Sequence, residues 1–327
     1  MGADELRLED VLGDAERPYV VRRERLYTRD ELMQGWHPGA DHSATLDGRI
    51  YEYVKAHGGR APDMIEGLAQ RMHDFFIDSA LVDFFMEDAR PVVGIMGGSR
   101  TLASDRNYGR VVELAASLAQ RGYLVVGGGG LGIMEAANLG AYLAGCSDDE
   151  RHDAVQALAQ APGYAADQAG YLEVAVGIRE RFAPCGESLA IPTWVSEGEP
   201  ISQFASHIAK YFSNSIREDG LLAVATAGIV FAPGDAGTMQ EIFQDAAQNA
   251  YKVFGRSPMV MLDRQHYCAD TGLYPALHRQ AERLGFADLL SVADEPAEVL
   301  DRFPARHPAP DAADTPRSVL MRMRNLR

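Results

Sequence analysis

The sequence predicts an α/β fold with a doubly wound, Rossmann-like parallel sheet, helices on both faces of that sheet, and a helical N-terminal extension. Two observations lead to this prediction. From residue 91 onward, short and continuously apolar segments alternate with amphipathic helical segments, which is typical of strands buried on both faces of a parallel sheet. Three glycine-rich turns also follow such strands, and ligands of these sheets bind where the strands end.

Composition divides the chain into three parts. Residues 1–90 are predicted to form a helical extension, with helices over Thr45–His57 and Met64–Met86, that packs on the main domain or on a partner subunit. Residues 91–303 hold the Rossmann-like domain. Residues 304–327 begin as a proline-rich linker and end as a basic segment that forms a short helix or a frayed tail.

The strands of the main domain are predicted from short apolar runs bounded by turn residues. In chain order these runs are Val92–Met96, Tyr123–Val126, Tyr171–Val176, Ser188–Ile191, Ala227–Ala232, Pro258–Leu262 and Leu290–Ala293. Helices are predicted between them, where apolar residues recur at helical spacing. These helices are Tyr108–Gln120, Ile133–Ala144, Asp148–Ala161, Ile201–Thr226, a pattern that includes Ile242–Ala247, Tyr274–Leu284 and Pro296–Phe303.

The net charge and the cysteines restrict the classes of partner. The 327 residues carry a formal net charge of −16, which argues against binding to DNA, RNA or anionic lipid. No apolar run is long enough to span a membrane, and the acidic N-terminus lacks an apolar signal core, so we expect a cytoplasmic protein with no membrane partner. The three cysteines are scattered, and no cluster of His, Cys and carboxylates predicts a metal site.

The most informative turn is Pro233–Glu241, which links the apolar run Ala227–Ala232 to a helical pattern. A glycine-rich turn from strand to helix directs free backbone N–H groups and the positive end of a helix dipole at one place, and that place suits a phosphate. Thr238 adds a hydroxyl, and Glu241 adds a carboxylate one turn further on. The same spacing, Thr238-x-x-Glu241, also fits a capping box that only begins a helix.

Two other turns extend this motif to a predicted crevice. Gly97-Gly98-Ser99-Arg100 offers N–H groups, a hydroxyl and a guanidinium. Gly127–Gly132 formally satisfies G-x-G-x-x-G, which makes an NAD-dependent enzyme a lower-ranked alternative. That fingerprint belongs in the first βα unit, whereas it lies in the second unit here, and the acidic residue expected at the end of the next strand is missing.

The three turns resemble, in order and spacing, the LONELY GUY family of nucleoside 5′-monophosphate phosphoribohydrolases. The matching segments are Gly97–Arg100, Gly128–Asn138 and Pro233–Glu241, and the resemblance covers residues 91–303. It implies a nucleotide-binding catalytic domain that hydrolyses a nucleoside 5′-monophosphate to free base and ribose 5-phosphate without a cofactor. It also implies a homodimer or a larger homo-oligomer.

The resemblance also assigns roles to individual residues. Glu241 matches the catalytic Glu of the family, and Arg217 is the match to its catalytic Arg. Substrate and phosphate contacts are implied for Gly97, Ser99, Arg100, Gly129, Gly130, Met134, Gly234, Gly237 and Thr238. Two residues depart from the family pattern: Asp235 replaces the second Gly of the hallmark, and Glu218 replaces the Lys that follows the Arg. The identity of the base and the effect of Asp235 on activity are therefore left open.

Other functions fit parts of the same pattern. The main alternative is a non-catalytic nucleotide or molybdenum-cofactor carrier, because such carriers are similar in architecture. Relatives of the family are often labelled lysine decarboxylases, but that chemistry needs pyridoxal phosphate on a Schiff-base lysine. The chain has only Lys55, Lys210 and Lys252, and none of them lies in a glycine-rich turn.

Overall fold

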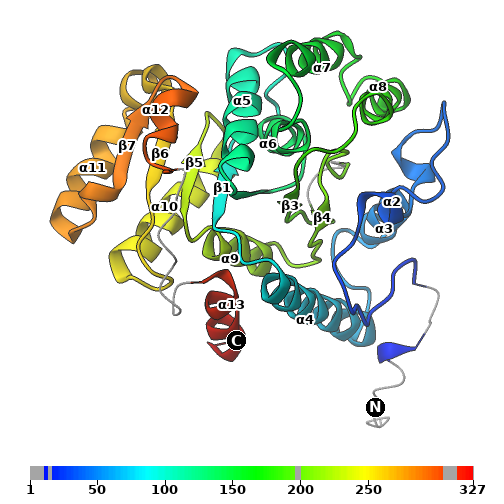
Figure 1. Ribbon diagram of the computed structural model, residues 1–327. Helices are drawn as coiled ribbons and strands as arrows, with labels where there is room; N and C mark the ends of the chain where they lie inside the picture. Colours follow the sequence, from blue (N-terminus) through cyan, green and yellow to red (C-terminus); the bar gives the residue numbers. More distant parts are fainter. Residues whose placement is uncertain (1–10, 14–16, 196–199, 305–314, 327) are drawn as a thin grey trace.

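A seven-stranded parallel sheet forms the centre of the protein in the computed structural model, which describes residues 11–13, 17–195, 200–304 and 315–326 (Figure 1). Its strands are β1 (Val92–Met96), β2 (Leu124–Gly127), β3 (Ser188–Ala190), β4 (His207–Ile208), β5 (Gly228–Phe231), β6 (Met259–Leu262) and β7 (Leu290–Ala293). Every neighbouring pair runs parallel. The predicted α/β fold with a doubly wound sheet is confirmed.

The first strands of the two halves of the sheet, β1 and β5, are neighbours. The order across the sheet is β4-β3-β2-β1-β5-β6-β7, so the chain builds outward from β1 to β4 and then returns to β5. β1 therefore pairs with β2 on one side and with β5 on the other. The turns that follow these three strands lie at the same edge of the sheet, at the switch point where such folds bind ligands.

Alternate side chains of the strands enter two hydrophobic cores, one on each face of the sheet. Val92 and Met96 of β1 belong to one core, while Val93 and Ile95 belong to the other. This division follows from the pleat, since successive side chains of a strand point to opposite faces. All five residues of β1 are buried, which explains why its sequence is continuously apolar.

Helices cover both cores. The core that contains Val93 is covered by α5 (Arg106–Gln120), α6 (Ile133–Tyr142), α7 (Asp148–Gln160), α8 (Gln168–Arg181) and α12 (Pro296–Leu300). The core that contains Val92 is covered by α4 (Met64–Glu87), α9 (Asn214–Val224), α10 (Ala236–Tyr251) and α11 (Leu273–Leu284). Short helical turns lie at η1 (His42–Ala44), η2 (Gln265–Asp270) and η3 (Ala287–Leu289).

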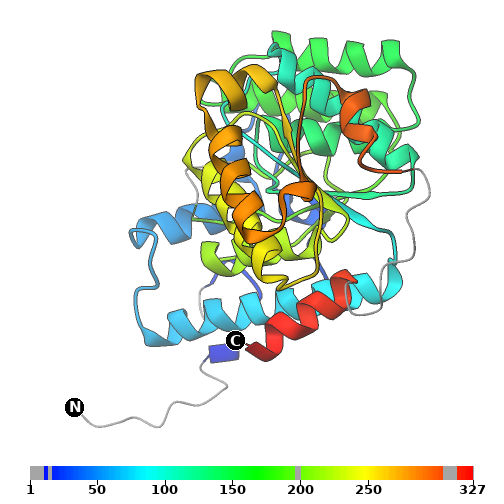
Figure 2. The same ribbon diagram turned by 90° about the vertical axis from the view of Figure 1, so that its left-hand side faces the viewer.

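The two predicted helices of the N-terminal segment are present, as α3 (Leu46–Ala56) and α4, and a short α2 (Arg29–Leu32) precedes them. The C-terminal helix α13 (Pro316–Leu326) lies beside α4 and also contacts α9 (Figure 2). Val319, Leu320 and Met323 bury its apolar face. The two ends of the chain therefore pack against the same side of the sheet. The predicted linker over 304–316 lies largely outside the described residues.

A buried ion pair between Asp47 and Lys210 links α3 to the loop that follows β4. Asp47 accepts hydrogen bonds from Lys210 Nζ at 2.6 Å and from Trp194 Nε1 at 2.8 Å, and His42 Nε2 lies 2.9 Å from its other oxygen. The side chains of Asp47 and Lys210 are 0% and 1% exposed. Burial raises the pKa of Asp47, but the neighbouring Lys210 and His42 outweigh burial and hold that pKa below its ordinary value.

Two predicted elements are wrong. The predicted strand Tyr171–Val176 lies inside α8, where Asp167 caps the helix and the buried residues recur at helical spacing. The predicted helix Ile201–Thr226 is helical only over Asn214–Val224. In the first part of that segment, His207 and Ile208 form strand β4, which pairs with β3. Ile208 also forms a bridge to Tyr27. Tertiary pairing here outweighs local helical propensity.

Within the described ranges, none of the helices combines the length and the apolar character that crossing a membrane requires.

We expect Lys210→Met to lower the free energy of unfolding by about 3–5 kcal/mol, because it leaves the carboxylate of Asp47 buried without its cation. Chemical denaturation measures this loss. The double variant Asp47→Asn/Lys210→Met should recover part of the loss, since no uncompensated charge remains. Lys55→Met is the matched control, because Lys55 is 61% exposed in its pair with Glu52; a similar loss in this control would contradict the assignment.

Candidate functional site

A cavity of about 220 Å³ lies at the carboxyl edge of the sheet, where the turns after β1 and β5 meet α6 and α9. The residues that line it are Gly97, Gly98, Ser99, Met134, Asn214, Arg217, Glu218, Asp235, Gly237, Thr238, Gln240 and Glu241. Seven of the eleven residues predicted from sequence are among them. Asn214 and Gln240 line the cavity without having been predicted, because an isolated amide carries no motif.

The turns after β1 and β5 touch backbone to backbone. The N–H of Gly98 donates to the carbonyl of Pro233 at 3.0 Å. A Cβ added at Gly234 would lie 2.2 Å from Thr238 Oγ1 and 2.8 Å from Gly98 N. Gly234 is therefore required by this close approach of two backbones. Gly234 does not line the cavity, so its contact with a ligand stays a prediction while its structural role is evident.

The turn after β2 supports the other two turns. Gly132 has a φ of 66°, and the N–H of Ile133 donates to the carbonyl of Gly98 at 3.1 Å. Gly129 has a φ of 78° and packs against Ala190, which explains its identity without a ligand. Neither Gly129 nor Gly130 lines the cavity; from this region only Met134 does so.

The first turn of α10 faces the cavity. Asp235 is the N-cap residue and makes no side-chain capping bond, so the capping box suggested by Thr238-x-x-Glu241 does not form, because Thr238 already lies in the third position of the helix. The first N–H groups of the helix have no partner within the helix. A Cβ added at Gly237 would meet nothing within 4 Å. Packing within the protein thus gives no reason for glycine at 237, whereas a ligand that approaches the backbone would.

The carboxylate of Asp235 turns toward Arg100. Arg100 donates to Asp235 Oδ2 from Nη2 at 2.6 Å and from Nε at 3.1 Å. Both side chains are exposed, at 82% and 61%. The pair holds the negative charge of Asp235 at the rim and neutralises it there. Arg100 itself does not line this cavity but lines a neighbouring one.

Glu241 lies on α10 one helical turn after Thr238, lines the cavity and is buried. Burial raises the pKa of Glu241 to about 7, although the positive charge of Arg217 lowers it and the negative charge of Glu218 raises it further. A buried carboxylate with a perturbed pKa in a cavity is typical of a functional group.

Arg217 is held in place by two acceptors. Its Nε donates to the carbonyl of Ile191, just after β3, at 2.8 Å, and its Nη1 donates to Glu218 Oε2 at 3.1 Å. The side chains of Arg217 and Glu218 are 12% and 5% exposed. Glu218, which replaces the Lys of the family pattern, therefore accepts a hydrogen bond from the guanidinium whose charge also lowers the pKa of Glu241.

A second cavity, of about 400 Å³, adjoins the first through Ser99. Its wall contains Glu135, which accepts hydrogen bonds from Tyr108 Oη at 2.9 Å and Tyr171 Oη at 2.5 Å. Burial raises the pKa of Glu135 to about 7 against the lowering effect of these two hydrogen bonds. Sequence reasoning did not single out Glu135, since the partner Tyr171 lies in the segment that was predicted as a strand.

In the described part of the chain, no group of three or more His, Cys, Asp or Glu side chains is arranged to hold a metal ion. Lys210 forms the buried ion pair with Asp47 and does not line the cavity. Its position therefore gives no support to a role as a Schiff-base lysine.

Comparisons with known proteins agree with the family resemblance over the first part of the sheet. Residues 90–147, which hold β1, α5, β2 and α6, match the model of the SLOG cluster4 family. This match is consistent with a LONELY GUY-like protein, although it does not extend to the turn after β5. A search of curated proteins finds no match.

Solved structures show a similar chain course at low identity. A molybdenum cofactor binding protein from Rippkaea orientalis is 14% identical, with a TM-score of 0.41 over 65% of this chain and 94% of that one. A molybdenum cofactor carrier protein from Chlamydomonas reinhardtii is 19% identical, with the same TM-score and coverage. Similarity at this level carries no inference about a ligand of this chain.

Two glycine variants separate packing from ligand contact. Gly234→Ala should lower the free energy of unfolding by about 1–3 kcal/mol, because its Cβ meets backbone atoms. Gly237→Ala should be neutral or raise it by about 0.5–1 kcal/mol, since alanine favours a helix and the space is open. Thermal unfolding measures both changes in stability. When it is repeated with inorganic phosphate, we expect phosphate to stabilise the wild type more than Gly237→Ala. Equal effects of phosphate on both proteins would contradict a phosphate site at this turn.

Proposed function

We propose that the protein hydrolyses the N-glycosidic bond of a nucleoside 5′-monophosphate to free base and ribose 5-phosphate. The observation that carries this proposal is the arrangement on α10: Gly237 and Thr238 line the cavity in the first turn, where N–H groups have no partner within the helix, and a buried carboxylate, Glu241, follows one turn further on. The first part can hold a phosphate and the second can act on the sugar to which that phosphate is attached.

The 5′-phosphate binds at the first turn of α10. The N–H groups and the positive end of the helix dipole favour an anion, and the hydroxyl of Thr238 adds a donor. Asp235 does not oppose this binding, because Arg100 neutralises its carboxylate at the rim. Binding energy from the phosphate positions the ribose, so a nucleoside that lacks the phosphate should react poorly.

Glu241 acts at the anomeric carbon. Cleavage of the C1′–N bond proceeds through an oxocarbenium-like transition state, and a carboxylate beside C1′ stabilises the positive charge that develops there. Glu241 in its ionised form also accepts a proton from the attacking water. The water oxygen bonds to C1′, and the base leaves with the electrons of the broken bond and takes up a proton.

Arg217 tunes and orients this carboxylate. Its positive charge favours the ionised form of Glu241, while its hydrogen bonds to Ile191 and Glu218 fix the guanidinium at the cavity wall. The cavity that contains Glu135 adjoins the site on the side of Ser99, and it offers the more apolar surface that a base requires.

The test of this proposal is a base-release assay over the common nucleoside 5′-monophosphates. Wild type should release free base from at least one of them, and Glu241→Gln should reduce kcat by about 10²–10⁴-fold, the usual contribution of a general base. Asp245→Asn is the matched control, because Asp245 is a buried carboxylate on the same helix that does not line the cavity. Nucleotide binding by calorimetry with no release from any substrate would overturn the hydrolase and select the carrier.

The pH profile should report the ionisation of Glu241. Because the ionised form acts and the pKa of Glu241 is about 7, kcat/KM should fall about tenfold per pH unit below pH 7 and reach a plateau above it. Glu218→Gln removes a negative charge that raises this pKa, so the midpoint should move to lower pH. A wild-type midpoint near 4.3, the ordinary value for glutamate, or a midpoint unchanged in Glu218→Gln, would contradict the assignment.

A further inference from the structure

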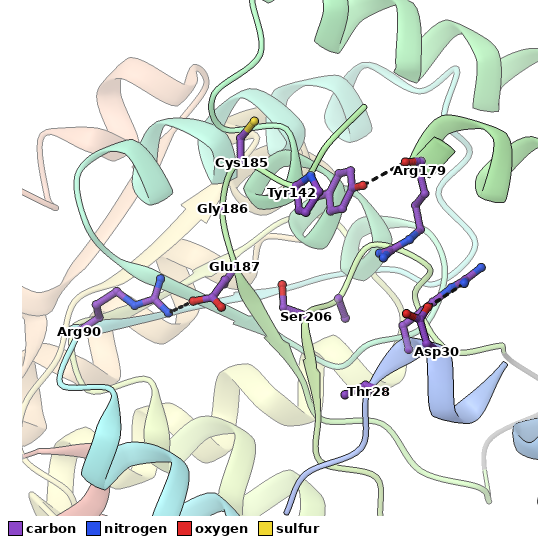
Figure 3. A pocket seen from close by; sticks show the side chains of 12 residues that line it. Thr28, Asp30, Arg90, Tyr142, Arg179, Cys185, Gly186, Glu187 and Ser206 are labelled. Carbon is purple, nitrogen blue, oxygen red and sulfur yellow. Dashed lines mark hydrogen bonds and ion pairs between the residues drawn. The ribbon is translucent and has the colours of Figure 1, made fainter. Parts of the chain in front are cut away.

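A larger pocket, of about 640 Å³, lies apart from the candidate site, where α2, α6 and α8 meet the segments that lead into β1, β3 and β4 (Figure 3). Its size falls within the range of about 300–1,000 Å³ that is usual for small-molecule sites. Three arginines line it: Arg29, Arg90 and Arg179. Two carboxylates, Asp30 and Glu187, also line the pocket, so its lining carries a small net positive charge in a chain whose net charge is −16.

One of these arginines is already neutralised. Arg90 pairs with Asp88 at 2.5 Å and with Glu187 at 2.7 Å. Figure 3 shows Arg90 and Glu187 on one side of the pocket, and Arg179 with Asp30 on the other. A ligand that needs positive charge would therefore bind on the side of Arg179.

The hydrogen bonds of the other two arginines, Arg29 and Arg179, go mainly to one residue, Gln203. Nε of Arg29 donates to Gln203 Oε1 at 2.9 Å, and Nη1 of Arg179 donates to the carbonyl of Gln203 at 2.8 Å. The only carboxylate found within ion-pair distance of either, among the described residues, is that of Asp30, which is 78% exposed. Two positive charges thus face one solvated negative charge.

Arg29 also has a donor that nothing in the described structure satisfies. Its Nη2 is shielded from solvent and has no hydrogen-bond partner there. Burial lowers the pKa of Arg29 and the positive charge of Arg179 lowers it further, against the raising effect of Asp30, so the two guanidinium groups repel each other. An anion beside them would offset this repulsion.

We propose that the Arg29–Arg179 side of this pocket is a second ligand site, distinct from the cavity of Glu241, which binds the phosphate group of a small phosphorylated metabolite. A phosphate dianion matches two guanidinium forks in charge and geometry. The hydroxyls of Thr28 and Ser206 and the ring of Tyr142 line the remaining space and would contact the organic part of the ligand. The site does not depend on the proposed hydrolase activity.

Equilibrium dialysis of the full-length protein against labelled inorganic phosphate tests the proposal. Wild type should bind two phosphates per chain and Arg179→Met one. Arg181→Met is the matched control, because Arg181 lies on the same helix, is 57% exposed in its pair with Asp153, and its removal changes the net charge equally. This control should still bind two phosphates. Gly237→Ala should weaken only the other site, so failure of one site is distinguishable from failure of the other.

If Arg179→Met does not fold, Arg179→Lys keeps the charge, and it should weaken phosphate binding at this site at least tenfold, since an ammonium group lacks the planar fork. Phosphate binding that is unchanged in the Arg179 variant, or reduced equally in Arg181→Met, would overturn the site. Displacement of phosphate by malonate at lower concentration than by glycerol phosphate would overturn the ligand class.

Discussion

The contact between the turns after β1 and β5 is the constraint on which the candidate site depends. Because the strand order reverses at β1, these turns leave the sheet side by side, and their backbones meet where Gly98 and Gly234 carry no side chain. The hydrogen bond from Gly98 to Pro233 then fixes the direction in which α10 begins. The N–H groups of α10, the side chain of Glu241 and the wall formed by Ser99 are consequently positioned by this main-chain contact.

Burial sets the charge state of the carboxylates on α10. Glu241 and Asp245 lie one turn apart on the same face of this helix, and burial raises both pKa values, to about 7 and about 8. Glu241 has Arg217 nearby, whereas Oδ2 of Asp245 has no hydrogen-bond partner among the described residues. Arg217 thus favours ionisation of Glu241, whereas burial alone sets the raised pKa of Asp245. Glu218 bears on the chemistry of Glu241 because it accepts a hydrogen bond from Arg217 and its own negative charge raises the pKa of Glu241.

The sequence predicts the sheet well because parallel strands buried on both faces are apolar throughout, and such runs are short and bounded by glycine. It fails at Tyr171–Val176 and at Ile201–Thr226, where the decision between helix and strand depends on pairing and packing partners that are distant in the chain. For the site, motif and resemblance identify Glu241, Arg217 and the turns. They do not show which glycines serve packing and which face the cavity. That distinction between Gly234 and Gly237 depends on what lies within 4 Å of a Cβ added at each position.

Two adjacent residues connect the candidate site to the arginine-lined pocket. The N–H of Ser202 donates to the carbonyl of Gly129 in the turn after β2, at 2.9 Å, and the next residue, Gln203, accepts from Arg29 and Arg179. The turn after β2 in turn supports Gly98 through the N–H of Ile133. The segment of Ser202 and Gln203 therefore links the arginine-lined pocket to the turn that supports the cavity, not to the cavity wall itself.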